Sequence, residues 1–320
     1  MVRPNYDLPG PTDRVTSSTR PADVRLSIRP VQPFDLAQSI AFLRGFTPCS
    51  GDHLYATGTL TTGGFADEAP FVAVVSEEAA DDGTLAVDVD WIDDPGDPEA
   101  VGAWLRGFLS LDDDLTGLYA TARDDPSFAG VVEELHGYHH VRFPTPFEAA
   151  CWAALSQRTP MAASRRLKRD LVEAAGRVAT VDGDEVALFP TPGMVLDAAP
   201  AVRDAIDHDR KSRTLLAAAE AFAGEDLAAL DDDALRERLA DVWGFGEWSA
   251  EFVALRGFGR LSGLPRTERR LREAVAELYD LDADEATDAD LDRLAAPYGR
   301  QRGYWAHYVR VWAFRWSLDE

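Results

Sequence analysis

One stretch of the chain decides the fold: Asp241-Val-Trp-Gly-Phe-Gly-Glu-Trp-Ser-Ala250, with Leu264-Pro-Arg-Thr-Glu-Arg-Arg-Leu271 shortly after it. The pattern predicts a helix, a tight hairpin at Gly244-Phe245-Gly246, and a second helix that begins near Glu247. Glycines let such a turn present its backbone N–H groups outward, where they can hold a phosphate. The hairpin therefore indicates a site for a phosphorylated ligand, and Glu268 would lie beside that ligand at the start of a third helix.

Length and composition restrict the class of protein. The chain has 320 residues, enough for two or three domains with a substantial core. No stretch of about 18 residues is apolar enough for a membrane span. The polar residues 1–23 lack the apolar segment of a signal peptide, so we expect a cytoplasmic location. The only cysteines, Cys49 and Cys151, exclude a disulfide framework and a four-thiolate zinc or iron–sulfur site.

The net charge is extreme, at −24, with 56 acidic residues against 32 lysines and arginines. Only two of the basic residues are lysines, Lys168 and Lys211. Such a surface suits a salt-rich cytoplasm, because at 1 M salt the Debye length is about 3 Å and repulsion between acids is screened. We therefore interpret the chain as halophilic. The alternative is an ordinary acidic protein that avoids nucleic acids.

The acidic residues are unevenly distributed along the chain. None occurs in residues 149–169, 252–267 or 293–317. Two explanations remain open at this point: these windows are ordinary core segments, or their basic residues converge on a polyanion site. The basic residues in question include Arg158, Arg165, Arg166, Lys168, Arg169, Arg256, Arg260, Arg266, Arg300, Arg302, Arg310 and Arg315.

Apolar periodicity divides the chain into three parts. Residues 1–24 are predicted to be a disordered tail. Residues 25–111 alternate strand-like and helical patterns, typical of a small α+β domain with an antiparallel sheet. Residues 112–320 show helical spacing throughout, and we expect an all-helical region there. The predicted fold class is mainly α with an N-terminal α+β domain.

Two further patterns bear on ligand binding. One predicted helix ends at Gln157 and Arg158, and the next begins after Pro160. A polar pair exposed at a helix junction can push into a duplex, although an ordinary interhelical loop would look the same. Aromatic residues also recur at helical spacing, and they pack in a core or line a cleft that stacks an electron-poor or cationic ring. These are Trp248 and Phe252 in one helix and Tyr304, Tyr308 and Trp312 in the last.

Glu268 is the chemical candidate. An acid in the first turn of a helix often does no more than complement the helix dipole. A functional glutamate there would be ionised and aimed from a fixed helix end, where it could orient a water molecule or stabilise a developing cation. The six histidines show no spacing typical of metal ligands, and we interpret them as structural.

Together these features resemble the helix-hairpin-helix DNA glycosylase superfamily, and within it the DNA-3-methyladenine glycosylase II (alkylpurine) branch. The resemblance extends from about residue 25 to residue 316, and it implies that residues 112–320 form two helical subdomains with the active-site cleft between them. Ala154-Leu-Ser-Gln-Arg158 is similar to the wedge loop of that family, and Trp243-Gly-Phe-Gly-Glu-Trp-Ser-Ala250 is similar to its hairpin. Trp248 stands where the lyase branches usually carry a lysine. The resemblance therefore implies an enzyme that forms no Schiff base.

The resemblance also implies roles for individual residues. Glu268 occupies the place of the catalytic aspartate, with a side chain one methylene longer, and Thr267 is the alternative at that position. Gln157 and Arg158 would form the DNA wedge. The phosphate-binding residues would be Gly244, Phe245, Gly246, Arg266 and Arg269. The base pocket would be lined by Phe42, Trp248, Phe252, Tyr308 and Trp312.

The implied function is excision of alkylated purines from double-stranded DNA that contains damaged bases. Alkylation at N3 or N7 makes the purine a cationic leaving group, and the products would be the free base and an abasic site. We expect a monomer without a cofactor, although a monovalent cation could sit at the hairpin. Two alternatives stay open: a damaged-DNA-binding protein of the same fold that is catalytically impaired, and a glycosylase for oxidised or deaminated purines.

Overall fold

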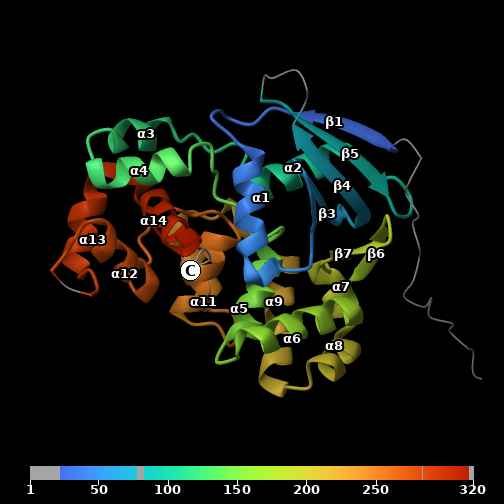
Figure 1. Cartoon of the computed structure of the whole chain (residues 1–320). Coiled ribbons are helices and arrows are strands. Elements are labelled where there is room, and N and C mark those ends of the chain that lie inside the picture. Colours follow the sequence, from blue (N-terminus) through green and yellow to red (C-terminus); the bar gives the residue numbers. More distant parts are fainter. Residues whose placement is uncertain (1–21, 78–82, 283, 317–320) are drawn as a thin grey trace, which may run out of the picture.

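A five-stranded antiparallel sheet forms the N-terminal part of the protein (Figure 1). The computed structural model describes residues 22–77, 83–282 and 284–316. Residues 1–21 of the predicted tail lie outside the described residues, and Val24 already belongs to the first strand. The strand order is β1-β5-β4-β3-β2. The strands are β1 (Val24–Ile28), β2 (Leu54–Ala56), β3 (Thr59–Ala66), β4 (Ala69–Glu77) and β5 (Leu85–Trp91).

Local sequence explains the turns and caps of this part. The two-residue turn between β3 and β4 is Asp67-Glu68, both at positive φ, a conformation that matches the twist of a hairpin. Asp35 caps α1 (Leu36–Gly45), because its carboxylate accepts hydrogen bonds from two first-turn N–H groups. The next helix, α2 (Pro98–Leu109), packs with the sheet in one hydrophobic core.

The remainder is helical except for one β-hairpin. Its helices are α3 (Thr116–Ala122), α4 (Pro126–Glu134), α5 (Pro146–Ser156), α6 (Met161–Ala175), α7 (Pro192–Asp197), α8 (Ala199–Ile206), α9 (Asp209–Gly224), α10 (Asp232–Ala240), α11 (Glu247–Arg256), α12 (Arg269–Leu278), α13 (Asp288–Ala295) and α14 (Arg302–Trp316). Three short 3₁₀ helices are η1 (Thr47–Cys49), η2 (Leu227–Ala229) and η3 (Ala296–Gln301). None of the helices within the described ranges is long and apolar enough to cross a bilayer.

The β-hairpin corrects the prediction that residues 112–320 are all-helical. Strands β6 (Arg177–Val181) and β7 (Asp184–Leu188) pair across a turn at Asp182-Gly183, where both residues have positive φ. Asp-Gly between two short β-rich runs is a hairpin signal that the helical interpretation overlooked. The hairpin packs Leu188 against Val72 of β4. It therefore covers a face of the sheet.

The chain builds two large hydrophobic cores. The first, called the sheet core, unites the sheet and α1–α4 with α12–α14. The second, called the hairpin core, unites α5–α11. In Figure 1 the helices α5, α6, α8 and α9 lie below the sheet, and α12–α14 lie to the left. The C-terminal helices thus share a core with the N-terminal domain, so the predicted boundary at residue 111 is not a boundary between cores.

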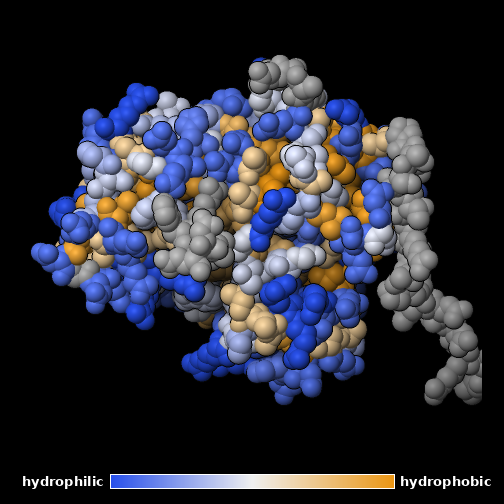
Figure 2. Space-filling model, in the orientation of Figure 1, coloured by the Kyte–Doolittle hydropathy of each residue, from blue (hydrophilic) through white to orange (hydrophobic). Residues whose placement is uncertain are grey.

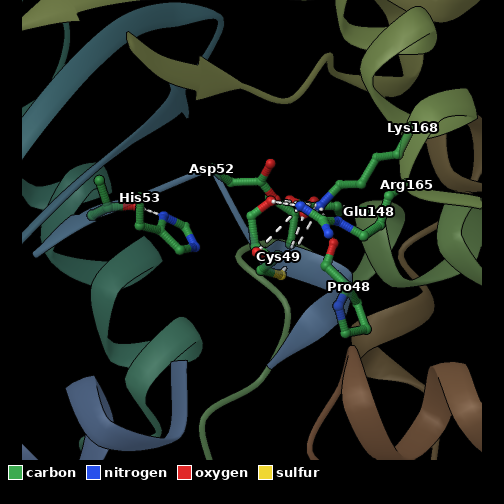
Figure 3. A network of polar contacts seen from close by, with 10 residues as sticks. Pro48, Cys49, Asp52, His53, Glu148, Arg165 and Lys168 are labelled. Atoms are coloured by element: carbon green, nitrogen blue, oxygen red, sulfur yellow. Dashed lines mark hydrogen bonds and ion pairs between the residues drawn. The ribbon is translucent and has the colours of Figure 1, made fainter. Parts of the chain in front are cut away.

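A buried lysine ties the two parts together (Figure 3). Lys168 of α6 donates to Glu148 of α5 at 2.5 Å, to Asp52 at 2.6 Å and to the carbonyl of Pro48 at 3.1 Å. Burial opposes the charge of this amine, but Asp52, Cys49 and Glu148 raise the pKa of Lys168 well above its ordinary value. The lysine therefore stays charged and joins the loop before β2 to α5 and α6.

We predict that Lys168→Met lowers the free energy of unfolding by about 3–5 kcal/mol, because it leaves two carboxylates without a cation in a site that excludes water. Urea unfolding would measure the change. The matched control is the triple variant Asp52→Asn/Glu148→Gln/Lys168→Met, which removes all three charges and should recover part of the loss. A single variant no less stable than the triple variant would contradict this account.

Candidate functional site

The glycine hairpin Gly244-Phe245-Gly246 lies where the sequence predicts it, between α10 and α11. Gly244 has a φ of +88°, and a Cβ there would come within 2.2 Å of Thr214 Oγ1 on α9, so the turn requires glycine. Gly246 is the exposed N-cap of α11, and among the residues that the structure describes no side chain caps the first-turn N–H groups. Phe245 packs against the hairpin core, so the turn can offer a ligand its backbone N–H groups.

The two predicted wedge residues have different surroundings. Gln157 is half-buried, and its amide donates to the carbonyl of Gly244 at 3.0 Å and to Ser249 Oγ at 3.1 Å. Arg158 is exposed and has a φ of +51°, a left-handed conformation that is uncommon for arginine. The structure thus uses Gln157 to hold the hairpin, and it presents Arg158 to solvent.

Lys211 joins the wedge loop to α9, a role that sequence reasoning missed. Its Nζ donates to three carbonyls at the end of α5, at 3.3 Å from Ala154, 2.7 Å from Leu155 and 3.1 Å from Gln157. A cation favours the C-terminal end of a helix, where carbonyl groups lack partners. The wedge loop, the hairpin and the first turns of α9 therefore form one junction.

An aromatic row runs from α11 toward α1. Trp248 is 52% exposed and stacks on Phe252 with ring centroids 5.3 Å apart. Phe252 contacts Phe143 at 5.8 Å, Phe143 contacts Phe46 at 5.3 Å, and Phe46 stacks on Phe42 at 5.2 Å. The structure therefore connects the predicted pocket residues Trp248, Phe252 and Phe42 through two rings that the sequence analysis did not select.

Tyr308 departs from its predicted place in the base pocket. Its side chain is fully buried in the sheet core, and its hydroxyl donates to the carbonyl of Tyr138 at 2.5 Å. Trp312 is partly buried against the same core. Spacing at i and i+4 places both residues on one face of α14 but does not say what that face contacts. Of the two possibilities that the sequence left open for Tyr308, packing in a core is correct.

Glu268 is the N-cap of α12, one residue earlier in the helix than predicted. Its carboxylate accepts from Arg310 Nη1 of α14, at 3.0 Å on Oε1 and 3.2 Å on Oε2. The carboxylate makes no hydrogen bond to the first turn of its own helix. Thr267 beside it is exposed. The ion pair therefore fixes the carboxylate on α14, in place of the helix-capping role that the sequence alone would favour.

A second guanidinium lies behind this ion pair. Arg256 of α11 is 1% exposed and stacks over Phe46 at 4.5 Å and over Phe42 at 5.2 Å. Burial lowers the pKa of Arg256 to about 10, and burial together with the nearby arginines lowers the pKa values of His140 and His307 well below their usual range. The histidines are thus neutral, and His140 Nε2 can accept from Arg256 at 2.8 Å.

Comparisons with known proteins agree with this geometry. No family profile matches the chain. A DNA-3-methyladenine glycosylase of Bacillus subtilis is 24% identical over 217 residues, which cover 66% of this chain and 71% of that protein. A 3-methyladenine DNA-glycosylase from Archaeoglobus fulgidus superposes with a TM-score of 0.72 at 20% identity, over 92% of this chain and 99% of that one. The chain has the helix-hairpin-helix DNA glycosylase fold.

Other proteins of this fold differ in chemistry. An 8-oxoguanine glycosylase/lyase from Clostridium acetobutylicum superposes with a TM-score of 0.64 at 16% identity, over 94% of this chain and 99% of that one. A probable bifunctional transcriptional activator/DNA repair enzyme AlkA of Mycobacterium tuberculosis is 29% identical over 58% of this chain, which spans 38% of its length. The shared helix-hairpin-helix fold therefore leaves the lesion to be argued from the site.

The arginines predicted to bind phosphate are engaged elsewhere in this helix-hairpin-helix chain. Arg266 pairs with Asp292 at 2.6 Å. Arg269 pairs with Glu273 at 2.9 Å and with Glu285 at 3.1 Å. A phosphate contact would have to replace these bonds. The acid-free windows thus converge only in part on a polyanion site, because acids distant in sequence neutralise several of their arginines.

One cluster has the geometry of a metal site. Ligand atoms of Cys49, Asp52 and Glu148 lie within 4.8 Å of one another. The ammonium of Lys168 already bonds to both carboxylates (Figure 3). The cation in this cluster is therefore the protein's own lysine, and the residues do not fit a metal ion. His53, next to Asp52, is also buried, and burial lowers its pKa to about 4.

We predict that the free energy of unfolding falls as the pH is lowered from about 6.5 to about 4, in part because His53 takes up a proton on unfolding. Its pKa is about 4 in the folded state and about 6.5 in the unfolded chain, so the unfolded state binds more protons in this window. One such group contributes about 1.4 kcal/mol per pH unit. Urea unfolding of His53→Gln should show a dependence shallower by that amount, and parallel curves would refute the assignment.

Proposed function

We propose that this protein is a monofunctional DNA glycosylase that flips alkylated purines of the 3-methyladenine type out of double-stranded DNA and releases them hydrolytically. The observation that carries the proposal is the position of Glu268. It stands at a helix start beyond a phosphate-type hairpin, held by Arg310. A preorganised carboxylate stabilises the cationic sugar that develops as the base leaves.

The lysines support hydrolysis without a covalent intermediate. A lyase step needs an amine nucleophile. The chain has two lysines. Lys168 is buried between two carboxylates, and Lys211 donates to three backbone carbonyls. Trp248 occupies the first turn of α11, where it can offer only a ring. Neither lysine side chain is available to form a Schiff base, so water would be the nucleophile.

The remaining features suit base flipping. The hairpin N–H groups would hold a backbone phosphate. Arg158, exposed on its strained loop, would fill the gap left by the flipped base. The exposed ring of Trp248, already stacked on Phe252, offers a surface for the extruded base. A purine alkylated at N3 or N7 is cationic, so it is both attracted to aromatic faces and a good leaving group.

A second candidate is a protein that binds damaged DNA without releasing the base. The same ion pair favours it, because Arg310 already neutralises the carboxylate of Glu268. Single-turnover base release from methylated DNA in high potassium chloride separates the two functions. Release of free base above the spontaneous rate supports the glycosylase, whereas tight binding without release supports the binding protein.

We predict that Glu268→Gln abolishes measurable base release while lesion binding remains. Loss of one preorganised charge at a developing cation costs about 3–4 kcal/mol, or about 10²–10³ in rate. Single-turnover rates on methylated DNA measure the effect. Thr267→Val is the matched control and should keep its activity. Activity lost in Thr267→Val but kept in Glu268→Gln would move the catalytic role to Thr267.

We predict that Arg158→Ala weakens binding to a paired lesion more than binding to a lesion that is already unpaired. A wedge offsets the few kcal/mol needed to extrude a paired base, and that cost is absent in a bulge. Fluorescence anisotropy with the two duplexes measures the difference. Equal losses on both substrates would make Arg158 a simple phosphate contact.

A further inference from the structure

Several exposed arginines have no ion pair among the described residues, Arg123 after α3 and Arg270 of α12 included, and the largest group of them lies in the wedge loop, α6, α8 and α9. In a chain with a net charge of −24, acids pair with Arg238 of α10 and with Arg269 and Arg272 of α12. Figure 2 shows the hydrophilic surface over α12 and α13 at the left. Among the described residues, six exposed arginines of the wedge loop, α6, α8 and α9 have no such pair. They are Arg158, Arg166, Arg169, Arg203, Arg210 and Arg213.

Arg213 is held in place by an aromatic ring. Its guanidinium lies 3.9 Å from the ring centroid of Trp243. Trp243 is 39% exposed, one of few large apolar side chains with such exposure in the described part of the chain. Stacking on an indole face orients a guanidinium and leaves its N–H edge free to donate to two oxygens of one anion. The stack is therefore a preorganised cationic group without an anion.

The stack borders the hairpin. Trp243 directly precedes Gly244, and Thr214, which follows Arg213 on α9, fills the space where a Cβ of Gly244 would lie. Lys211 on the same helix bonds to the carbonyl of Gln157 in the wedge loop. Arg213 and Trp243 line a surface hollow of about 490 Å³ that also contains Asp209 and Glu220. Neither acid forms a salt bridge with Arg213 within the described ranges.

We propose that Arg213 stacked on Trp243, together with Arg210, is a second contact for the DNA backbone that extends the hairpin interface along α9. The inference rests on the proposed function, because it needs the hairpin to hold a DNA phosphate. A phosphate diester suits an exposed guanidinium whose acid partners are absent, since the bond is charge-assisted and can be bidentate. Continuity with the hairpin favours DNA over an acidic peptide.

The test compares Arg213→Gln with Arg123→Gln, an exposed arginine at the end of α3 that changes the net charge equally. Affinity is measured by fluorescence anisotropy for a duplex that extends past the hairpin in both directions and for one truncated on the α9 side. Arg213→Gln should bind the long duplex about threefold to tenfold more weakly. Its slope of log K against log salt should be less steep by about 0.9.

Further measurements decide whether Arg213 contacts the DNA backbone. Trp243→Leu should give a smaller loss on the long duplex, and both variants should match wild type on the truncated one. Equal losses of affinity in Arg213→Gln and Arg123→Gln would overturn the proposal. So would a loss of affinity for poly-glutamate in Arg213→Gln without a loss of affinity for the long duplex. If the variants lose affinity only for the long duplex but the wild-type protein releases no base, the proposed glycosylase activity is refuted and this DNA contact still holds.

Discussion

The charged cluster around Lys168 is the constraint on which the arrangement of the site depends. It joins the loop before β2 to α5 and α6, and the wedge loop lies between those two helices. Buried charges of this kind are stable only when every partner is present. The position of Arg158 therefore depends on an interaction in which the wedge takes no part. The same lysine occupies the position that a metal ion would take.

A second constraint acts at the junction of wedge, hairpin and α9. Gln157 holds the carbonyl of Gly244, and Lys211 holds the carbonyls at the end of α5. Both bonds are made by long polar side chains that would be free to contact DNA if they were exposed. Because they are used internally, the proposed contacts with DNA fall to the hairpin N–H groups, to Arg158 and to the exposed arginines of α9, Arg210 and Arg213. This division suits a salt-rich solvent, in which unpaired surface charges are screened.

The ion pair between Glu268 and Arg310 bears on both candidate functions, base release and binding without release. It orients the carboxylate and also neutralises it, so the same geometry supports catalysis and binding without catalysis. Behind it, Arg256 remains buried on aromatic faces beside neutral histidines. The site is thus aromatic and cationic on one side, and the carboxylate of Glu268 lies at its edge, so its pairing with Arg310 bears directly on the proposed activity.

The sequence by itself determined the elements with local causes: the Gly244–Gly246 hairpin and the start of α11 near Glu247, which both follow from the glycine turn. It did not determine which faces meet. Tyr308 has the same helical spacing as Trp312, yet it is buried in the sheet core, and Arg266 lies in an acid-free window yet pairs with an acid distant in sequence. Local patterns fix conformation within a few residues, whereas burial and ion pairs depend on neighbours that only tertiary packing supplies.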